Sequence, residues 1–138
     1  GIFATDKFEV GSLICFEIAA DDIPRGLARD GAELILSQTN NADFGYSDET
    51  FQQAAIARLR AIETGRAVVN ISTVGLSAIY LPDGSVLDEL TWYTADAMIQ
   101  SVPLFKGSTP ATGLGIWFDG LNAILAAGFL VLGLGRKR

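Results

Sequence analysis

The chain has 138 residues, 49% of them hydrophobic, and a formal net charge of −6, which fits one domain with a hydrophobic core. Its ten basic residues stand against sixteen acidic ones, and the body of the chain has no basic patch, so a nucleic-acid partner is not expected. One cysteine and no histidine exclude an internal disulfide, histidine-based catalytic triads and zinc sites. We therefore expect no metal and no cofactor.

The first half of the chain is predicted to alternate strands and helices. The apolar, β-rich run Phe8–Phe16 predicts a strand. A short helix is expected within 21–32, where a proline stands near the start and a glycine at the end. A buried strand over 32–39 and a loop rich in Asn, Asp and Gly over 40–48 complete this half.

The clearest helix is predicted over 48–66. Acidic residues crowd its first turn, where they favour the helix dipole. Ala55, Leu59 and Ile62 fall on one stripe, as in an amphipathic helix, and Gly65 ends the pattern.

Successive strands are expected over 67–73, 76–81, 85–90 and 95–104, with a Pro-Asp-Gly turn at 82–84 that makes a hairpin. This order of elements predicts an α/β domain in which helices pack on a sheet. No glycine pattern forms a phosphate-binding loop.

The C-terminal segment predicts a transmembrane helix over 113–135. It holds eleven Leu, Ile, Val or Phe residues and a single charge, Asp119. A helix of about 20 residues spans roughly 30 Å, the thickness of a hydrocarbon core. A buried core helix or a glycine-rich pair of strands is the alternative interpretation.

Residues 136–138 form a basic cluster directly after this apolar run. By the positive-inside rule, the cluster places the C-terminus in the cytoplasm and residues 1–112 on the outer face of the membrane. Because the sequence has no start methionine and no signal peptide, we interpret it as the C-terminal piece of a longer protein.

Cys15, the one cysteine, allows two interpretations from its own neighbours. A cysteine within an apolar strand is most often inert packing. Glu17 argues against this, because side chains at i and i+2 share one face of a strand and would project together. A buried carboxylate beside a thiol costs free energy unless it is paired.

Three stretches together resemble the nitrilase (carbon–nitrogen hydrolase) superfamily: "LICFE", "ILSQTNNADFG" and "ARLRAIETGRAVVN". The third contains an Arg-Ala-x-Glu-x-Gly-Arg pattern that starts at Arg60 and ends at Arg66. The Cys-Phe-Glu form, the "TNNADFG" loop and the C-terminal apolar helix are most similar to the apolipoprotein N-acyltransferase branch. The resemblance implies the C-terminal portion of a nitrilase-like α-β-β-α sandwich over 1–112, followed by one transmembrane helix.

The resemblance also implies roles for residues around the cysteine. This superfamily uses a Glu-Lys-Cys triad, in which Cys15 would be the nucleophile and Glu17 a supporting hydrogen-bond partner. The backbone N–H of Phe16 would be an oxyanion donor. The general base and the lysine are expected upstream of residue 1, since the spacing of Lys7 and Glu9 does not match.

The loop corresponds to a substrate-binding loop of the family. Asn40, Phe44 and Gly45 match the family pattern, whereas Asn41 replaces the usual acid and Asp43 stands where tryptophan is common. An ordinary Asn-rich turn is the alternative.

The arginines of the predicted helix are expected to be structural. Glu63 and Arg66 stand at i and i+3, so they can pair on one helix face. Asn70 and Thr73 depart from the family pattern, which often has arginine and asparagine there.

The implied function is N-acylation of bacterial lipoproteins. A phospholipid would donate an acyl chain to Cys15 as a thioester, and the α-amine of the S-diacylglyceryl cysteine of an apolipoprotein would accept it. The full-length enzyme would be multi-pass in the cytoplasmic (inner) membrane, and this piece alone would be inactive. A soluble nitrilase-type amidase and a non-catalytic membrane-anchored remnant are the alternatives.

Overall fold

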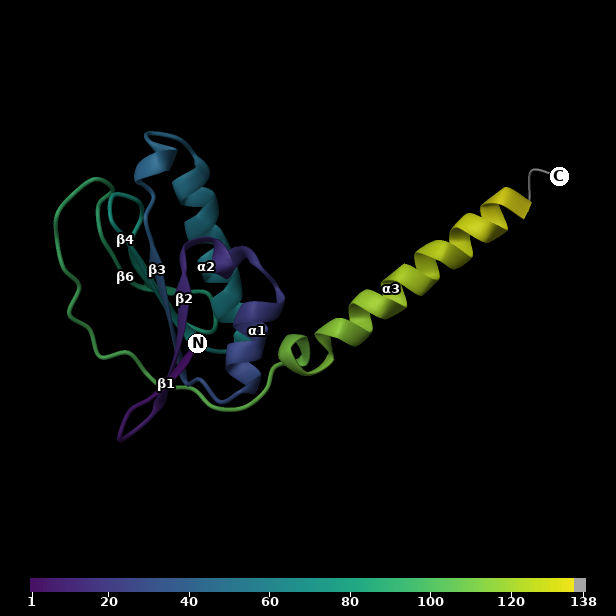
Figure 1. Ribbon diagram of the computed structural model, residues 1–138, viewed down its shortest axis with the longest axis horizontal. Helices are drawn as coiled ribbons and strands as arrows, with labels where there is room; N and C mark the ends of the chain where they lie inside the picture. Colours follow the sequence, from purple (N-terminus) through teal and green to yellow (C-terminus); the bar gives the residue numbers. More distant parts are fainter. Residues whose placement is uncertain (136–138) are drawn as a thin grey trace.

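A computed structural model describes residues 1–135, so the predicted basic tail at 136–138 lies outside the described residues. The body is a six-stranded mixed sheet in the order β1-β2-β3-β4-β5-β6, with α1 and α2 on one face (Figure 1). The expected α/β class is confirmed, with one sheet and one layer of helices in the body. The elements are β1 Ile2–Ala4, β2 Glu9–Ile14, the 3₁₀ helix η1 Cys15–Ala19, α1 Asp22–Arg29, β3 Leu34–Thr39, the 3₁₀ helix η2 Ala42–Phe44, α2 Glu49–Thr64, β4 Ala67–Ser72, β5 Ala78–Tyr80, β6 Val86–Glu89 and α3 Pro110–Gly135.

The middle of the sheet is parallel and the edges are antiparallel. β2, β3 and β4 run in the same direction, and their register places Leu13 beside Ser37 and Ser37 beside Asn70. Because the carboxyl ends of parallel strands meet at one edge, the turns after these three strands lie together. The turns that begin at Cys15 and Asn40 are therefore neighbours.

The hydrophobic core lies between the sheet and the two helices. Leu13, Ile35 and Val68 are fully buried on the central strands, and Leu27 of α1 and Ala57 of α2 pack against them. Burial of an aliphatic side chain of this size contributes about 1.5–3 kcal/mol. Leu13 thereby anchors the end of β2 two residues before the cysteine.

The predicted apolar stripe of α2 does not face the core. Leu59 is 55% exposed and Ile62 is 48% exposed, and Ala55 is exposed with them. The buried face holds small and polar side chains, namely Thr50, Gln53, Ala54, Ala57, Arg60, Ala61 and Thr64. The expectation was wrong because alanines let the helix approach the sheet closely and leave the bulky residues outside.

Two further expectations differ from the structure. The segment 95–104 forms no strand; within it, Gln100 Nε2 donates to Asp88 of β6 at 2.9 Å, and after it the Phe105 N–H donates to the Glu33 carbonyl. The short strand β1, which pairs antiparallel with β2, was not predicted. A strand of three residues is too short for its side-chain alternation to show in the sequence.

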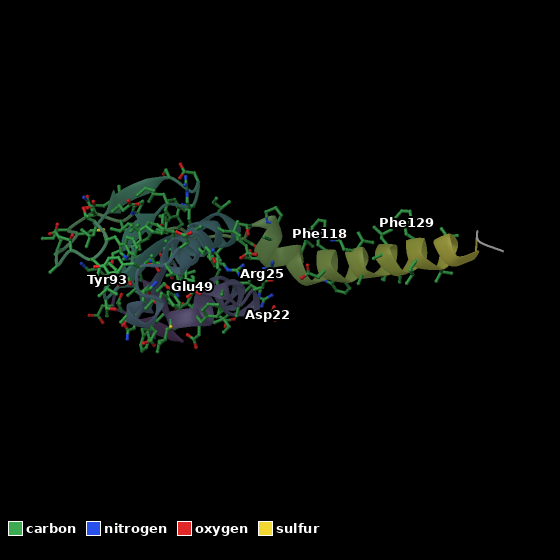
Figure 2. All side chains as sticks on the ribbon, turned by 90° about the horizontal axis from the view of Figure 1, so that it is seen from above. Asp22, Arg25, Glu49, Tyr93, Phe118 and Phe129 are labelled. Atoms are coloured by element: carbon green, nitrogen blue, oxygen red, sulfur yellow. The ribbon has the colours of Figure 1, made fainter. Side chains whose placement is uncertain are left out.

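The helix α3 begins beside α1 and α2 and projects away from the body (Figure 1). The Thr109 hydroxyl donates to the Glu63 carbonyl, and Arg25 Nη1 lies 3.7 Å from Asp119 Oδ2. Further along, Phe118 and Phe129 lie on the projecting part (Figure 2) and are 54% and 72% exposed. Within residues 1–135, no helix combines the length and the apolar character that crossing a membrane requires, so the predicted span is not confirmed.

Candidate active site

Cys15 lies at the point where β2 ends and η1 begins. Its φ of 54° is in the left-handed region, which non-glycine residues adopt rarely. The expected arrangement, with Cys15 and Glu17 on one face of a strand, is wrong because the chain turns into a 3₁₀ helix at the cysteine. We call Ile14–Glu17 the Cys15 turn.

Glu17 closes the Cys15 turn. Its carboxylate oxygen Oε2 accepts a hydrogen bond of 2.7 Å from the backbone N–H of Ile14. A hydrogen bond to a charged group contributes about 1.5–3 kcal/mol when it is sheltered, and less where water competes. Glu17 therefore supports the turn that presents the thiol.

The left-handed backbone of Cys15 allows a prediction about the stability of the chain. A left-handed residue with a Cβ costs about 1–2 kcal/mol, and glycine removes that cost at the expense of some unfolded-state entropy. We expect Cys15→Gly to raise the free energy of unfolding by about 0.5–1 kcal/mol in urea denaturation. Cys15→Ala, which keeps the Cβ, is the control and should change it little. Equal effects of the two substitutions would contradict strain at this residue.

Cys15 borders a cavity at the carboxyl edge of the parallel strands. Ile14, Cys15, Gln38 and Ile71 contribute to the lining of an open cavity of about 460 Å³ at the carboxyl edge of the parallel strands. Within residues 1–135, the polar side chain that contacts the thiol is that of Thr39, whose Oγ1 lies 3.9 Å from Sγ. The cysteine is therefore half-buried beside an open cavity.

A buried set of polar side chains lies behind the Cys15 turn, and Asn41 is at its centre. Asn41 is 2% exposed; its Nδ2 donates to Thr50 Oγ1 at 3.0 Å and to Gln53 Oε1 at 2.9 Å. Its Oδ1 accepts from Thr39 at 2.8 Å and from Ser72 at 3.0 Å. We call these five residues the Asn41 network. With its amide fully engaged, Asn41 supports the loop from inside, and the part of this loop in substrate binding stays a prediction.

The other residues of the predicted loop lie nearer the surface. Asn40 Oδ1 accepts from the Ala42 N–H at 3.1 Å and from the Thr73 hydroxyl at 2.7 Å, which joins the ends of β3 and β4. Gly45 has a φ of 54° and a ψ of −143°, which suits glycine. Phe44 and Phe16 line a second cavity of about 260 Å³ on the helix side of the Cys15 turn.

Arg60 holds η1 against α2. It is 5% exposed and donates to the carbonyls of Ile18 and Ala19, each at 2.9 Å. It also pairs with Asp21 and Glu63, and its hydrogen bond to Asp21 lowers the pKa of that carboxyl. The expected pairing of Glu63 with Arg66 is wrong, because Glu63 binds Arg60 and Arg25 instead.

Gln53 is the residue of this region that the sequence did not single out. It is 3% exposed on α2, and its Nε2 donates to the Cys15 carbonyl at 3.3 Å. A glutamine within a predicted helix resembles a solvated residue, so nothing in the local pattern marked it.

Comparisons with known proteins bear on the family and the fold of the chain. A model of the carbon-nitrogen hydrolase family matches residues 1–106. Two curated relatives are named apolipoprotein N-acyltransferase. The one from Gloeobacter violaceus is 36% identical over 90% of this chain and 24% of its own length. The one from Mycolicibacterium smegmatis is 33% identical over 96% of this chain and 22% of its own length. The chain thus spans about a quarter of the length of these relatives.

A solved structure of a mutant amidase from Nesterenkonia sp. AN1 superposes with a TM-score of 0.56 at 23% sequence identity. The match covers 65% of this chain and 36% of the amidase chain. The amidase structure is described as showing covalent addition of the acetamide moiety of fluoroacetamide at its active site cysteine. At this identity, the likeness shows a shared fold.

Proposed function

The chain belongs to the carbon-nitrogen hydrolase family, and from this premise we propose that it supplies the nucleophile of an apolipoprotein N-acyltransferase. The observation that carries the proposal is Cys15 itself, held with a φ of 54° at the end of β2 and open to a cavity. Strained backbone often accompanies a functional site, because the surrounding structure must hold it in place. The names of the curated relatives support the acyl-transfer reaction over amide hydrolysis.

The reaction takes place in two acyl transfers through the sulfur of Cys15. In the first, the thiolate attacks the ester carbonyl of a phospholipid; an S–C bond forms, the C–O bond breaks, and the lysophospholipid oxygen leaves with a proton. In the second, the α-amine of a diacylated apolipoprotein attacks the thioester. An N–C bond forms, the S–C bond breaks, and the amine proton passes to a base.

The residues around Cys15 support parts of these steps. The Phe16 N–H is the proposed donor to the oxyanion in each tetrahedral intermediate. Glu17 holds the turn through the Ile14 N–H. Asn40, Phe44 and Gly45 shape the loop beside the turn, where the acyl chain would enter. The base and the lysine of the triad would come from outside residues 1–138.

A membrane location is part of the proposal. The side chains of Phe118, Ile124, Phe129 and Val131 are between 54% and 72% exposed on α3, the helix that projects from the body (Figure 1). Exposed apolar side chains along the projecting part of a helix favour contact with lipid. The outer face of a bacterial inner membrane would give the site access to phospholipid and lipoprotein.

Trapping the acyl group tests the proposed function in the intact protein. Incubation with a phospholipid that carries labelled acyl chains should leave a hydroxylamine-labile label on the peptide that contains Cys15. The Cys15→Ser variant should leave no such label. If the wild-type protein binds the phospholipid but carries no label afterwards, a non-catalytic remnant would be favoured. Release of ammonia from small amides without any acyl adduct would favour an amidase.

A further inference from the structure

Gln53 contacts the same peptide unit that contains the proposed oxyanion donor. Its Nε2 donates to the carbonyl of Cys15 at 3.3 Å, and this carbonyl shares one peptide bond with the Phe16 N–H. A peptide unit is planar, and in its trans form the C=O and the N–H point in opposite directions. A contact that holds one of them therefore orients the other.

The rest of the Gln53 side chain is itself held. Its Oε1 accepts from Asn41 Nδ2 at 2.9 Å and lies 3.2 Å from Thr39 Oγ1. With Gln53 3% exposed, water does not compete for these bonds. The amide thus has one orientation, in which its N–H faces the Cys15 carbonyl.

The direction of the Phe16 N–H follows from this arrangement. By the planarity of the peptide it points away from the Gln53 amide, and the neighbouring Cys15 helps to line the 460 Å³ cavity, to whose lining α2 contributes no residue. In addition, a hydrogen bond to the carbonyl polarises the peptide and strengthens its N–H as a donor.

We propose that Gln53 is a positioning residue that orients and polarises the Cys15–Phe16 peptide so that the Phe16 N–H faces the developing oxyanion. This inference rests on the proposed function, because it concerns the acyl-transfer step at Cys15. Gln53 acts through the peptide and touches neither the thiol nor the substrate.

Two substitutions separate this role from a general structural one. Gln53→Glu keeps an oxygen acceptor for Asn41, removes the donor to the Cys15 carbonyl and adds a negative charge. Gln53→Met removes the donor and the acceptor without adding charge. Gln52→Glu is the matched control, because it adds the same charge one residue away on the exposed side of α2.

The test compares two reactions of Cys15 in the intact protein. Acylation by phospholipid forms an oxyanion, whereas alkylation by iodoacetamide displaces iodide at a saturated carbon and forms none. Loss of an oxyanion donor costs about 10²–10³-fold in rate, so we expect both Gln53 variants to slow acylation by about 10²-fold. Alkylation and its pH profile should change by less than about threefold, and Gln52→Glu should change neither reaction. Parallel loss of both reactions, or unchanged acylation, would overturn the proposal.

A second measurement tests the geometry without any acyl transfer. Because Cys15 is the one cysteine of the 138-residue chain, labelling with carbonyl-¹³C cysteine marks a single carbonyl for infrared spectroscopy. Gln53→Met should move its band to higher frequency, as a lost hydrogen bond does, and Gln52→Glu should not. An unmoved band overturns the positioning role. If the band moves but the wild-type protein is not acylated by phospholipid, Gln53 orients the peptide but the proposed function has failed. The oxyanion part of this proposal then fails with it.

Discussion

Replacing Arg66 with methionine is expected to lower the free energy of unfolding by about 3 kcal/mol, one of the two largest effects that we expect on stability. Arg66 is 4% exposed and stands between Gly65, which caps α2, and the first residue of β4. Its Nε donates to the Ala32 carbonyl at 2.5 Å, and its Nη2 donates to the Gly107 carbonyl at 2.7 Å. Longer contacts reach the carbonyls of Ala28, Thr64 and Gly65.

The size of the Arg66 effect follows from these bonds. Each hydrogen bond to a charged donor contributes about 1.5–3 kcal/mol, and without the arginine the buried carbonyls lose their partner. Burying the charged guanidinium costs free energy, and methionine avoids this cost, so part of the loss is offset. The same burial lowers the pKa of Arg66. Methionine fills the space but restores no donor.

Urea denaturation followed by circular dichroism measures this effect. Arg66→Lys should recover only part of the loss, because one ammonium group cannot reach the acceptors on both sides. Arg29→Met removes an exposed arginine of α1 and should stay within about 0.5 kcal/mol of the wild type. The interpretation fails if Arg66→Met is no more destabilising than Arg29→Met.

Substituting Gly75 with alanine is expected to destabilise the chain by about 2–4 kcal/mol and to disturb the active site. Gly75 is buried between β4 and β5. A Cβ there would lie 2.3 Å from Thr50 Oγ1, 2.7 Å from Ser72 Oγ and 2.9 Å from Asn41 Cγ. All three atoms belong to the Asn41 network, so none can move aside without breaking a buried hydrogen bond.

Gly26→Ala is the matched control for this substitution. Gly26 lies within α1, and a Cβ at this position meets nothing within 4 Å. Alanine is about 0.5–1 kcal/mol better than glycine inside a helix, so this variant should gain stability. The two Gly→Ala changes should therefore shift the urea midpoint in opposite directions. A shift in the same direction would contradict the crowding around Gly75.

In the intact protein, Gly75→Ala should also slow acylation of Cys15. The Asn41 network holds Gln53, and Gln53 holds the Cys15 carbonyl at 3.3 Å. Displacement of Asn41 by an added methyl group therefore reaches the Cys15 turn through two hydrogen bonds. The packing around Gly75 therefore affects both the stability of the loops at the carboxyl edge of the sheet and the proposed acylation of Cys15.

The sequence by itself determined the order of most elements and the location of the candidate site. Alternating apolar residues and turn signals identified β2, β3, β4 and the hairpin of β5 and β6, although they placed Cys15 inside a strand that in fact ends at Ile14. These features are local, because hydrophobic periodicity and turn chemistry depend on residues close together in the chain. The parallel order of the strands then brings Cys15 and Asn40 to one edge.

Only the tertiary structure decided which side chains meet at that edge. Gln53 and Cys15 are 38 residues apart, and Arg66 and Gly107 are 41 apart, so no local pattern relates them. The buried face of α2 was also undetermined, because alanines that pack closely carry a weaker hydrophobic signal than the exposed Leu59 and Ile62. Hydrogen-bond partners and the face that a helix buries depend on which elements pack together, and that is a property of the folded chain.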